Sequence, residues 1–417
     1  MASSLPNIKI QTLENNLTVA AIETKNGSGV VSVDLFYKVG SRNEVMGKSG
    51  IAHMLEHMNF KSSKNLAAGE FDRVVKSYGG VTNASTGFDY THYFIKSASQ
   101  NTDKSLELLA ELMANLNLKD EEFQPERNVV AEERRWRTEN SPFGAMYFEL
   151  FNLAYQYHPY HWTPIGFMGD IESWTIDDIR AFHEAWYQPQ NAVLLAAGDF
   201  DAEEFFALAK KRFGAIKNSG AIKNVAVTEP VQRGARRSVL IKESEVEMLM
   251  IAWKIPAYDH ADMPALNALA SLLGEGQSSR LQEKLVDELR LVNSISSYTM
   301  ELSDPGLFIV AAICNPNVKA ERVEKEILSA IAATKTKPPT QKEIDKIKVL
   351  ARSEFIRSLE GSDSLARIFG DYLSRGDLKP LLSYEESIEK LKPKAVQTAA
   401  ANYLDADRSI TIILRSK

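Results

Sequence analysis

The chain carries an internal repeat, because a pattern in its first half returns about 216 residues later. Leu35–Val39, which reads LFYKV, corresponds to Ile251–Ile255, which reads IAWKI. Ile171-Glu172 corresponds to Ile388-Glu389 at a shift of 217. The 417 residues also exceed what one hydrophobic core usually holds. The sequence therefore predicts two copies of one domain.

Each predicted copy mixes strands with helices. Val30–Val39 and Ala192–Ala197 read as strands, whereas Ser105–Leu118 and Ile176–Trp186 carry apolar residues at helical spacing. This interleaving predicts an α+β fold, with two tandem homologous sandwiches of sheet and helices. The predicted boundaries are residues 1–216 for the N-terminal domain, 217–233 for the linker and 234–417 for the C-terminal domain.

Composition limits the kind of site and partner. Hydrophobic residues make up 44% of the chain and charged residues 25%, which is typical of a globular protein. A net charge of −6 argues against a nucleic-acid surface and allows basic peptides as partners. Cys314 is the only cysteine, so a metal site in this chain must use His and carboxylate ligands.

The first residues bear on the compartment. Met1–Pro6 pass directly into strand-like Ile8–Ile10, without the charged and apolar regions of a signal peptide. No apolar run approaches the roughly 20 residues that span a membrane. These features predict a cytoplasmic protein without a membrane partner. A periplasmic or organellar location is the alternative if a leader has been removed.

The segment Ile51–Phe60 contains the motif H-x-x-E-H, formed by His53, Glu56 and His57. Two His residues four positions apart share one face of a helix and can bind the same Zn²⁺. The motif is the inverted form of the zincin motif. The competing interpretation is a helix with two surface His residues and a solvated Glu.

The second copy of the repeat separates these interpretations. A shift of 216 places His53 on Leu269, Glu56 on Leu272 and His57 on Leu273. Polar groups at such core positions are unsatisfied unless something coordinates them or forms hydrogen bonds with them. The comparison favours a metal site over a surface helix.

A third ligand is expected to be a carboxylate, because catalytic zinc usually has three protein ligands. Glu126 and Glu133 are seven residues apart and share a face of one predicted helix, and Glu132 points about a quarter turn away. Spacing alone leaves Glu132 and Glu133 as alternatives. His158 and His161 are interpreted as loop residues that pack and form hydrogen bonds.

The chain resembles the pitrilysin/insulinase superfamily of zinc peptidases, and within it the half-length subfamily of mitochondrial processing peptidase subunits and bacterial relatives. The resemblance rests on H-x-x-E-H, on the Glu126–Glu133 segment about 75 residues later, and on further motifs along nearly the whole chain. These motifs are Gly79-Gly80-x-x-Asn83-Ala84-x-Thr86, Thr91-x-Tyr93, His158-Pro159-Tyr160, Tyr187-x-Pro189-x-Asn191, Gly198-Asp199 and Gly274-x-Gly276-x-Ser278-Ser279-Arg280-Leu281.

The resemblance implies a zinc endopeptidase that acts on short or unfolded peptides inside a clamshell, of which this chain is one half. It selects Glu133 as the third ligand beside His53 and His57, with one Zn²⁺ per chain. It makes Glu56 the general base and Glu126 a supporting acidic residue of the catalytic site. An extended peptide substrate is expected to pair with the sheet edge at Thr82-Asn83-Ala84.

One departure from the family pattern concerns the second domain. Active members usually carry an Arg and, seven residues later, a Tyr that contact the substrate and the oxyanion. Alignment places Val286 and Asn293 at these positions. We therefore expect a heterodimer, in which this chain bears the metal and a homologous subunit supplies the Arg/Tyr pair. The alternative function is a non-catalytic scaffold or core subunit of a larger complex.

Overall fold

The computed structural model describes residues 4–416, which form two compact units. Unit 1 comprises the residues up to Arg134, Trp162–Val227 and Phe355–Leu381. Unit 2 comprises Arg135–His161, Thr228–Glu354 and the residues from Leu382 on. The predicted domains are continuous halves of the chain, whereas each compact unit includes a segment from the other half.

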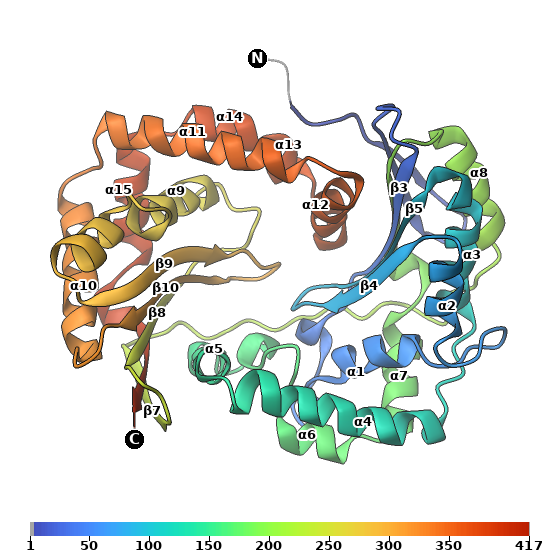
Figure 1. Cartoon of the computed structure of the whole chain (residues 1–417), viewed down its shortest axis with the longest axis horizontal. Coiled ribbons are helices and arrows are strands. Elements are labelled where there is room, and N and C mark those ends of the chain that lie inside the picture. The colour runs from blue at the N-terminus through green and yellow to red at the C-terminus, as the bar shows by residue number, and fades with distance from the viewer. Residues whose placement is uncertain (1–3, 417) are drawn as a thin grey trace. The chain divides into compact units, whose positions relative to one another are not determined.

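Unit 1 contains one sheet and the helices around it (Figure 1). Its strands are β1 (Lys9–Thr12), β2 (Thr18–Glu23), β3 (Val30–Tyr37), β4 (Val81–Thr86), β5 (Thr91–Ala98) and β6 (Ala192–Gly198). Its helices are α1 (Ile51–Asn59), α2 (Glu70–Ser77), α3 (Thr102–Ala114), α4 (Asp120–Arg134), α6 (Met168–Ser173), α7 (Ile176–Trp186), α8 (Ala202–Phe213) and α12 (Ser362–Arg375).

Unit 2 repeats this composition. Its strands are β7 (Arg236–Lys242), β8 (Met248–Lys254), β9 (Val292–Met300), β10 (Leu307–Cys314) and β11 (Ile410–Ser416). Its helices are α5 (Pro142–Ala154), α9 (Met263–Gly274), α10 (Ala320–Thr336), α14 (Tyr384–Glu389), α15 (Pro393–Tyr403) and most of α11 (Gln341–Ser358), while α13 (Lys379–Leu382) begins in unit 1.

The two sheets have the same topology. The strand order is β1-β2-β6-β3-β5-β4 in unit 1 and β7-β11-β8-β10-β9 in unit 2. In each sheet the last strand in sequence, β6 or β11, pairs parallel with one neighbour and antiparallel with the other. Apart from β1, the strands correspond one to one in sequence order. The predicted α+β fold with two homologous copies is therefore confirmed.

Side chains along β3 point alternately to the two faces of the first sheet. Val33 and Leu35 point into a core shared with α1, α3, α7 and α8. Phe36 points to the opposite face, which α12 covers (Figure 1). Gly370 permits this approach, because a Cβ atom there would lie 2.1 Å from the Phe36 ring. A helix from the second half of the sequence thus completes unit 1, and α5 covers the second sheet in the same way.

The expected elements match the structure closely. The helix expected over residues 176–186 is α7, and the strand expected over residues 30–39 contains β3. The segment expected to be helical over residues 105–118 is α3, which begins and ends earlier. Among residues 4–416, no helix is both long and apolar enough to cross a membrane.

Candidate metal centre

Helix α1 places its polar residues on one face. Its buried residues include Met54, Leu55 and Met58, which pack into the core of unit 1. His53 and His57, at the spacing i and i+4, lie on the other side and are partly buried. The apolar stripe therefore fixes the rotation of the helix and presents the motif away from the core.

A buried carboxylate holds the start of α1. Glu44 accepts hydrogen bonds from the Gly50 N–H at 2.8 Å and the Ala52 N–H at 2.9 Å. The Trp162 indole N–H donates to the same carboxylate at 2.6 Å. An acidic group at a helix N-terminus satisfies amides that have no partner within the helix. Glu44 has no local sequence signal, because its partner Trp162 is distant in sequence.

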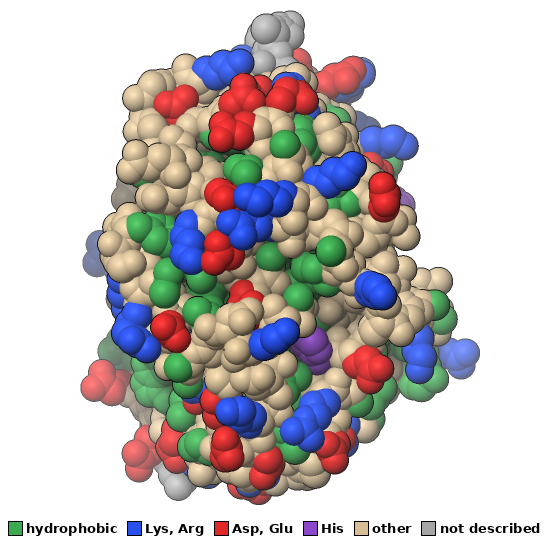
Figure 2. All heavy atoms as spheres, turned by 90° about the vertical axis from the view of Figure 1, so that its right-hand side faces the viewer, with side chains coloured by type: hydrophobic (Ala, Val, Ile, Leu, Met, Phe, Trp, Pro, Cys, Tyr) green, Lys and Arg blue, Asp and Glu red, His purple; other side chains and the backbone are tan. Residues whose placement is uncertain are grey.

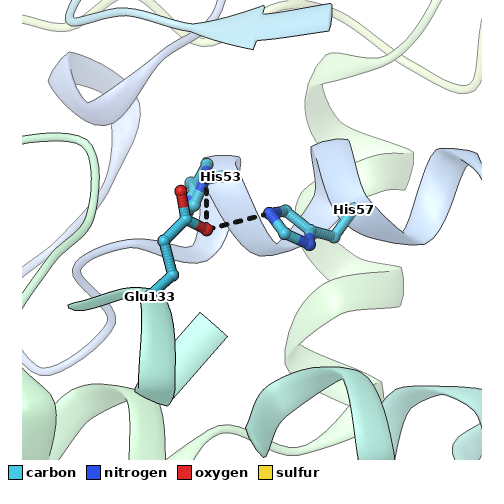
Figure 3. A group of neighbouring side chains, drawn as sticks. All are labelled: His53, His57 and Glu133. Carbon is cyan, nitrogen blue, oxygen red and sulfur yellow. Dashed lines mark ion pairs between the residues drawn. The ribbon is translucent and has the colours of Figure 1, made fainter. Parts of the chain in front are cut away.

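His53, His57 and Glu133 converge in unit 1, the last from the end of α4 (Figure 3). The Glu133 Oε2 atom lies 3.3 Å from His57 Nε2 and 3.6 Å from His53 Nε2. One ligand atom from each residue lies within 4.8 Å of the others. Tetrahedral zinc with ligand bonds of about 2.1 Å separates its ligand atoms by about 3.4 Å. The two N–O separations therefore fit zinc.

Glu126 lies about two helical turns before Glu133 on α4 and supports this cluster. Its Oε1 atom lies 2.8 Å from His57 Nδ1, and its Oε2 atom lies 2.5 Å from Lys61 Nζ. A hydrogen bond at Nδ1 orients the ring so that Nε2 faces Glu133. Lys61 was absent from the sequence predictions. Its only signal is its position four residues after His57.

The charge balance of the cluster favours a cation. Burial lowers the pKa of the His57 ring, but the carboxylates of Glu126 and Glu133 outweigh it and raise this pKa to about 9. Burial raises the pKa of Glu126, and the positive charges of His57 and Lys61 more than compensate, so that its pKa is below the usual range. The carboxylates thus stabilise positive charge where the His ring nitrogens meet.

Glu56 lies on the same helix, one residue before His57. The Thr86 hydroxyl at the end of β4 donates to Glu56 Oε2 at 2.5 Å. This is within the short range of a hydrogen bond from a hydroxyl to a charged carboxylate. Thr86 occurs in the sequence motifs, but its contact with Glu56 could not be predicted because β4 and α1 are separate elements.

The choice between Glu132 and Glu133 follows from the rotation of α4. Glu132 is exposed, whereas Glu133 is partly buried beside both His residues. The helix then widens into a π-helical segment, Arg135–Glu139. Such segments often occur near functional sites. The geometry agrees with Glu133, the residue that the family resemblance selects.

Several other His residues contact protein groups outside this cluster, and for His158 and His161 this agrees with the sequence interpretation. His158 Nε2 lies 2.9 Å from Asp304 Oδ2, and His161 Nδ1 lies 2.5 Å from the Tyr155 carbonyl oxygen. His92 Nε2 lies 2.6 Å from the buried Asp34 carboxylate. Among the described residues, the one group with metal-binding geometry is His53, His57 and Glu133.

The remaining predicted site residues lie on two strands and a helical segment. Thr82, Asn83 and Ala84 belong to β4, which is an edge strand of the first sheet and lies against α1. In unit 2, Val286 is in the π-helical segment Gln282–Glu288 and Asn293 is exposed in β9.

On the face drawn in Figure 2, basic and acidic side chains are interspersed.

Comparisons with known proteins cover nearly the whole chain. Residues 19–156 match the family model "Insulinase (Peptidase family M16)", and residues 173–349 match "Peptidase M16 inactive domain". A Helicobacter pylori protein named zinc protease PqqE is 51% identical over 99% of this chain and 94% of its own length. The beta subunit of the bovine mitochondrial-processing peptidase is 25% identical over 96% of this chain and 83% of its own.

The structural comparison gives the same result. The crystal structure of a protease from Helicobacter pylori has a TM-score of 0.96 and 51% identity, and the match covers 99% of this chain and 100% of the other. The half-length form expected from the sequence is confirmed, because the matches span 94% of one relative's length and 100% of the solved chain. The chain belongs to the M16 family of peptidases, as its resemblance to the insulinase superfamily predicts.

Proposed function

We propose that this chain is the metal-bearing subunit of a zinc-dependent endopeptidase that hydrolyses short or unfolded peptides. The observation that carries the proposal is the convergence of His53, His57 and Glu133, whose ligand atoms lie within 4.8 Å of one another. A relative that is 51% identical over almost the full length is named a zinc protease, which supports the same activity.

The three ligands would hold one Zn²⁺ per chain. Bound zinc would supply Lewis acidity toward the scissile carbonyl and would lower the pKa of a bound water. Glu126 acts through His57 by fixing the orientation and charge of its ring, and Lys61 forms an ion pair with Glu126. The ligand side chains are 12–21% exposed, so a peptide carbonyl and a water can reach the site.

Glu56 is the general base in this proposal. Its carboxylate takes a proton from the attacking water and later passes this proton to the nitrogen of the departing amine. Glu56 follows His53 by three residues, so its side chain leaves α1 on the side that carries the ligands, which supports this role. Removal of this proton acceptor is expected to stop turnover without loss of the metal.

The substrate is proposed to bind as an additional strand along β4. This strand pairs with β5 on one side and is the last strand of its sheet. Thr82 is anchored by a 2.8 Å hydrogen bond to the Phe94 carbonyl oxygen, and Asn83 Oδ1 accepts from the Ala84 N–H at 2.9 Å. Strand addition requires an extended backbone, which favours peptides and unfolded segments over folded proteins.

A partner subunit completes the active site in this proposal. Val286 and Asn293 occupy the positions where the family's Arg and Tyr are expected, and neither can supply a cationic or phenolic donor. One relative is named as a subunit of a processing peptidase, which supports a two-subunit arrangement.

The test compares the purified chain alone with the chain co-purified with its partner. Both are assayed on an unstructured peptide with zinc and with a chelator. We expect chelator-sensitive cleavage that rises at least about tenfold with the partner. Full activity of the isolated chain would contradict the two-subunit arrangement. Stoichiometric zinc without cleavage in either preparation would instead indicate a non-catalytic core subunit.

A further inference from the structure

Thr86 is the residue that connects the metal-site helix to the edge strand β4. Its hydroxyl donates to Glu56 Oε2 at 2.5 Å, and its backbone pairs with Thr91 of β5. The last residue of the strand proposed to hold the substrate therefore forms a hydrogen bond with the carboxylate proposed as the general base. Neither the family comparisons nor the sequence motifs assign a role to this contact.

The turn that follows Thr86 is firmly held. The Gly87 N–H donates to the Tyr90 carbonyl oxygen at 2.9 Å and closes the hairpin between β4 and β5. The Thr91 hydroxyl donates to the buried Val39 carbonyl oxygen at 2.8 Å. As a β-branched residue in a strand, Thr86 has few accessible rotamers. Its hydroxyl is thus delivered to Glu56 in a restricted geometry.

One short loop holds both the turn and helix α1. The Ser41 N–H donates to the Gly87 carbonyl oxygen at 3.2 Å, and the Arg42 N–H donates to that of Phe88 at 2.8 Å. The same loop ends at Glu44, whose carboxylate caps the first turn of α1. Gly40 permits this packing, because a Cβ atom there would lie 2.4 Å from the Gly87 carbonyl oxygen. The loop therefore fixes Thr86 relative to Glu56.

We propose that Thr86 is a positioning residue, which orients the Glu56 carboxylate by holding its Oε2 atom. This inference rests on the proposed function of Glu56 as general base. A threonine hydroxyl has one proton to donate, and here it donates to Oε2. The carboxylate accepts the water's proton, keeps its bond to Thr86 while protonated, and releases the proton to the leaving amine.

The placement couples chemistry to substrate binding. A peptide paired with β4 is registered by the backbone of the strand whose last side chain orients the base. Loss of the hydroxyl leaves the strand and the metal ligands in place but removes a restraint on the orientation of the Glu56 carboxylate. Misplacement of a reacting group by about 1 Å can reduce rates by about 100-fold. The effect should therefore fall on kcat and not on substrate binding.

The test uses the assembly in which the wild-type chain cleaves an unstructured peptide. For Thr86→Val we expect kcat to fall about 10- to 100-fold, with KM within about twofold and zinc content unchanged. Thr86→Ser keeps the hydroxyl and should retain most of kcat. Thr340→Val is the matched control, because Thr340 also donates to a glutamate, Glu343, at 2.9 Å on a helix of unit 2.

The outcomes separate this inference from the proposed function. A wild-type kcat for Thr86→Val would overturn the positioning role, as would loss of zinc or a rise in KM that accounts for the whole effect. Failure of Thr86→Ser to recover activity would also overturn it. If the wild-type, zinc-loaded assembly cleaves no peptide, the proposed function itself fails, and the positioning role falls with it.

Discussion

Helices α1 and α9 occupy equivalent places in the two copies of the fold but carry opposite chemistry. In α9, Leu269 and Leu273 are fully buried and Leu272 is 4% exposed, and all three belong to the core of unit 2. Their counterparts in α1 are His53, His57 and Glu56, which are partly exposed. The fold therefore does not require polar residues at these positions, and those of α1 are explained by the site they form.

Helix α4, which packs on α1, differs in the same sense from α11, which shares a core with α9. Helix α4 presents Glu126 and Glu133 to α1, and both contact its His residues. Helix α11 contributes Ile344 and Ile347 to the core that contains α9. The repeat shift of 216 places Glu133 on Val349, which is 69% exposed. A metal site in unit 2 would therefore need changes on both helices.

The largest expected effect concerns the third ligand. Glu133→Gln removes a charged ligand while keeping the shape of the side chain, so zinc affinity should fall by at least about 1,000-fold. Glu132→Gln changes the exposed neighbouring residue and should bind zinc as the wild-type protein does. Competition with a chromogenic chelator measures both affinities. Equal losses in the two variants would contradict the assignment of Glu133.

Exchange of chemistry between the two helices should have unequal effects on stability. Leu272→Glu buries a carboxylate that the core of unit 2 cannot pair, which should lower the free energy of unfolding by about 3–5 kcal/mol. Glu56→Leu replaces a partly exposed residue and loses the hydrogen bond from Thr86, so it should lower this free energy by only about 1–2 kcal/mol. Urea unfolding measures both. Similar losses for both variants would contradict the contrast between the helices.

Glu126 is expected to have a smaller effect than Glu133, because it acts through His57. Glu126→Gln keeps a hydrogen-bond acceptor but removes the charge, so zinc affinity should fall about 10- to 100-fold. The ion pair with Lys61 is lost as well, and Lys61→Met provides the matched test of that contribution. An affinity within twofold of wild type for Glu126→Gln would show that the carboxylate does not position His57.

The smallest expected effect is a pH dependence of the stabilisation by zinc. In the zinc-free protein the pKa of His57 is about 9, above the value of about 6.5 in an unfolded chain. Its contribution to stability is therefore complete below pH 6.5 and is lost as the pH rises through 9. A zinc-bound His57 is already deprotonated. The difference in unfolding free energy between loaded and zinc-free protein should grow by roughly 1–2 kcal/mol from pH 6.5 to 9, and a constant difference would contradict the raised pKa.

Much of the fold is predictable from the sequence because the repeat supplies an internal comparison. The correspondence of Leu35–Val39 with Ile251–Ile255 matches the equivalent places of β3 and β8 in the two sheets. The exchange of α5 and α12 between the halves could not be predicted. An apolar helical stripe shows that a helix packs on a sheet, but it does not show on which of two similar sheets.

The candidate site is predictable to different degrees along the chain. The H-x-x-E-H spacing identifies both His residues because helical geometry places them on one face. Selection of Glu133 over Glu132 needed the family resemblance, because the rotation of α4 against α1 is a tertiary property. Thr86, Lys61 and Glu44 escape local patterns for the same reason. Their partners Glu56, Glu126 and Trp162 lie on other parts of the chain.

The central claim is that α1 carries both metal ligands and the general base Glu56. The most direct measurement uses Glu56→Gln. Zinc content and the rate of peptide cleavage are determined on the same preparations of variant and wild-type assembly. The account predicts one zinc per chain in both and a loss of turnover of about 100- to 10,000-fold in the variant. Cleavage by Glu56→Gln at the wild-type rate, with zinc bound, would contradict the account.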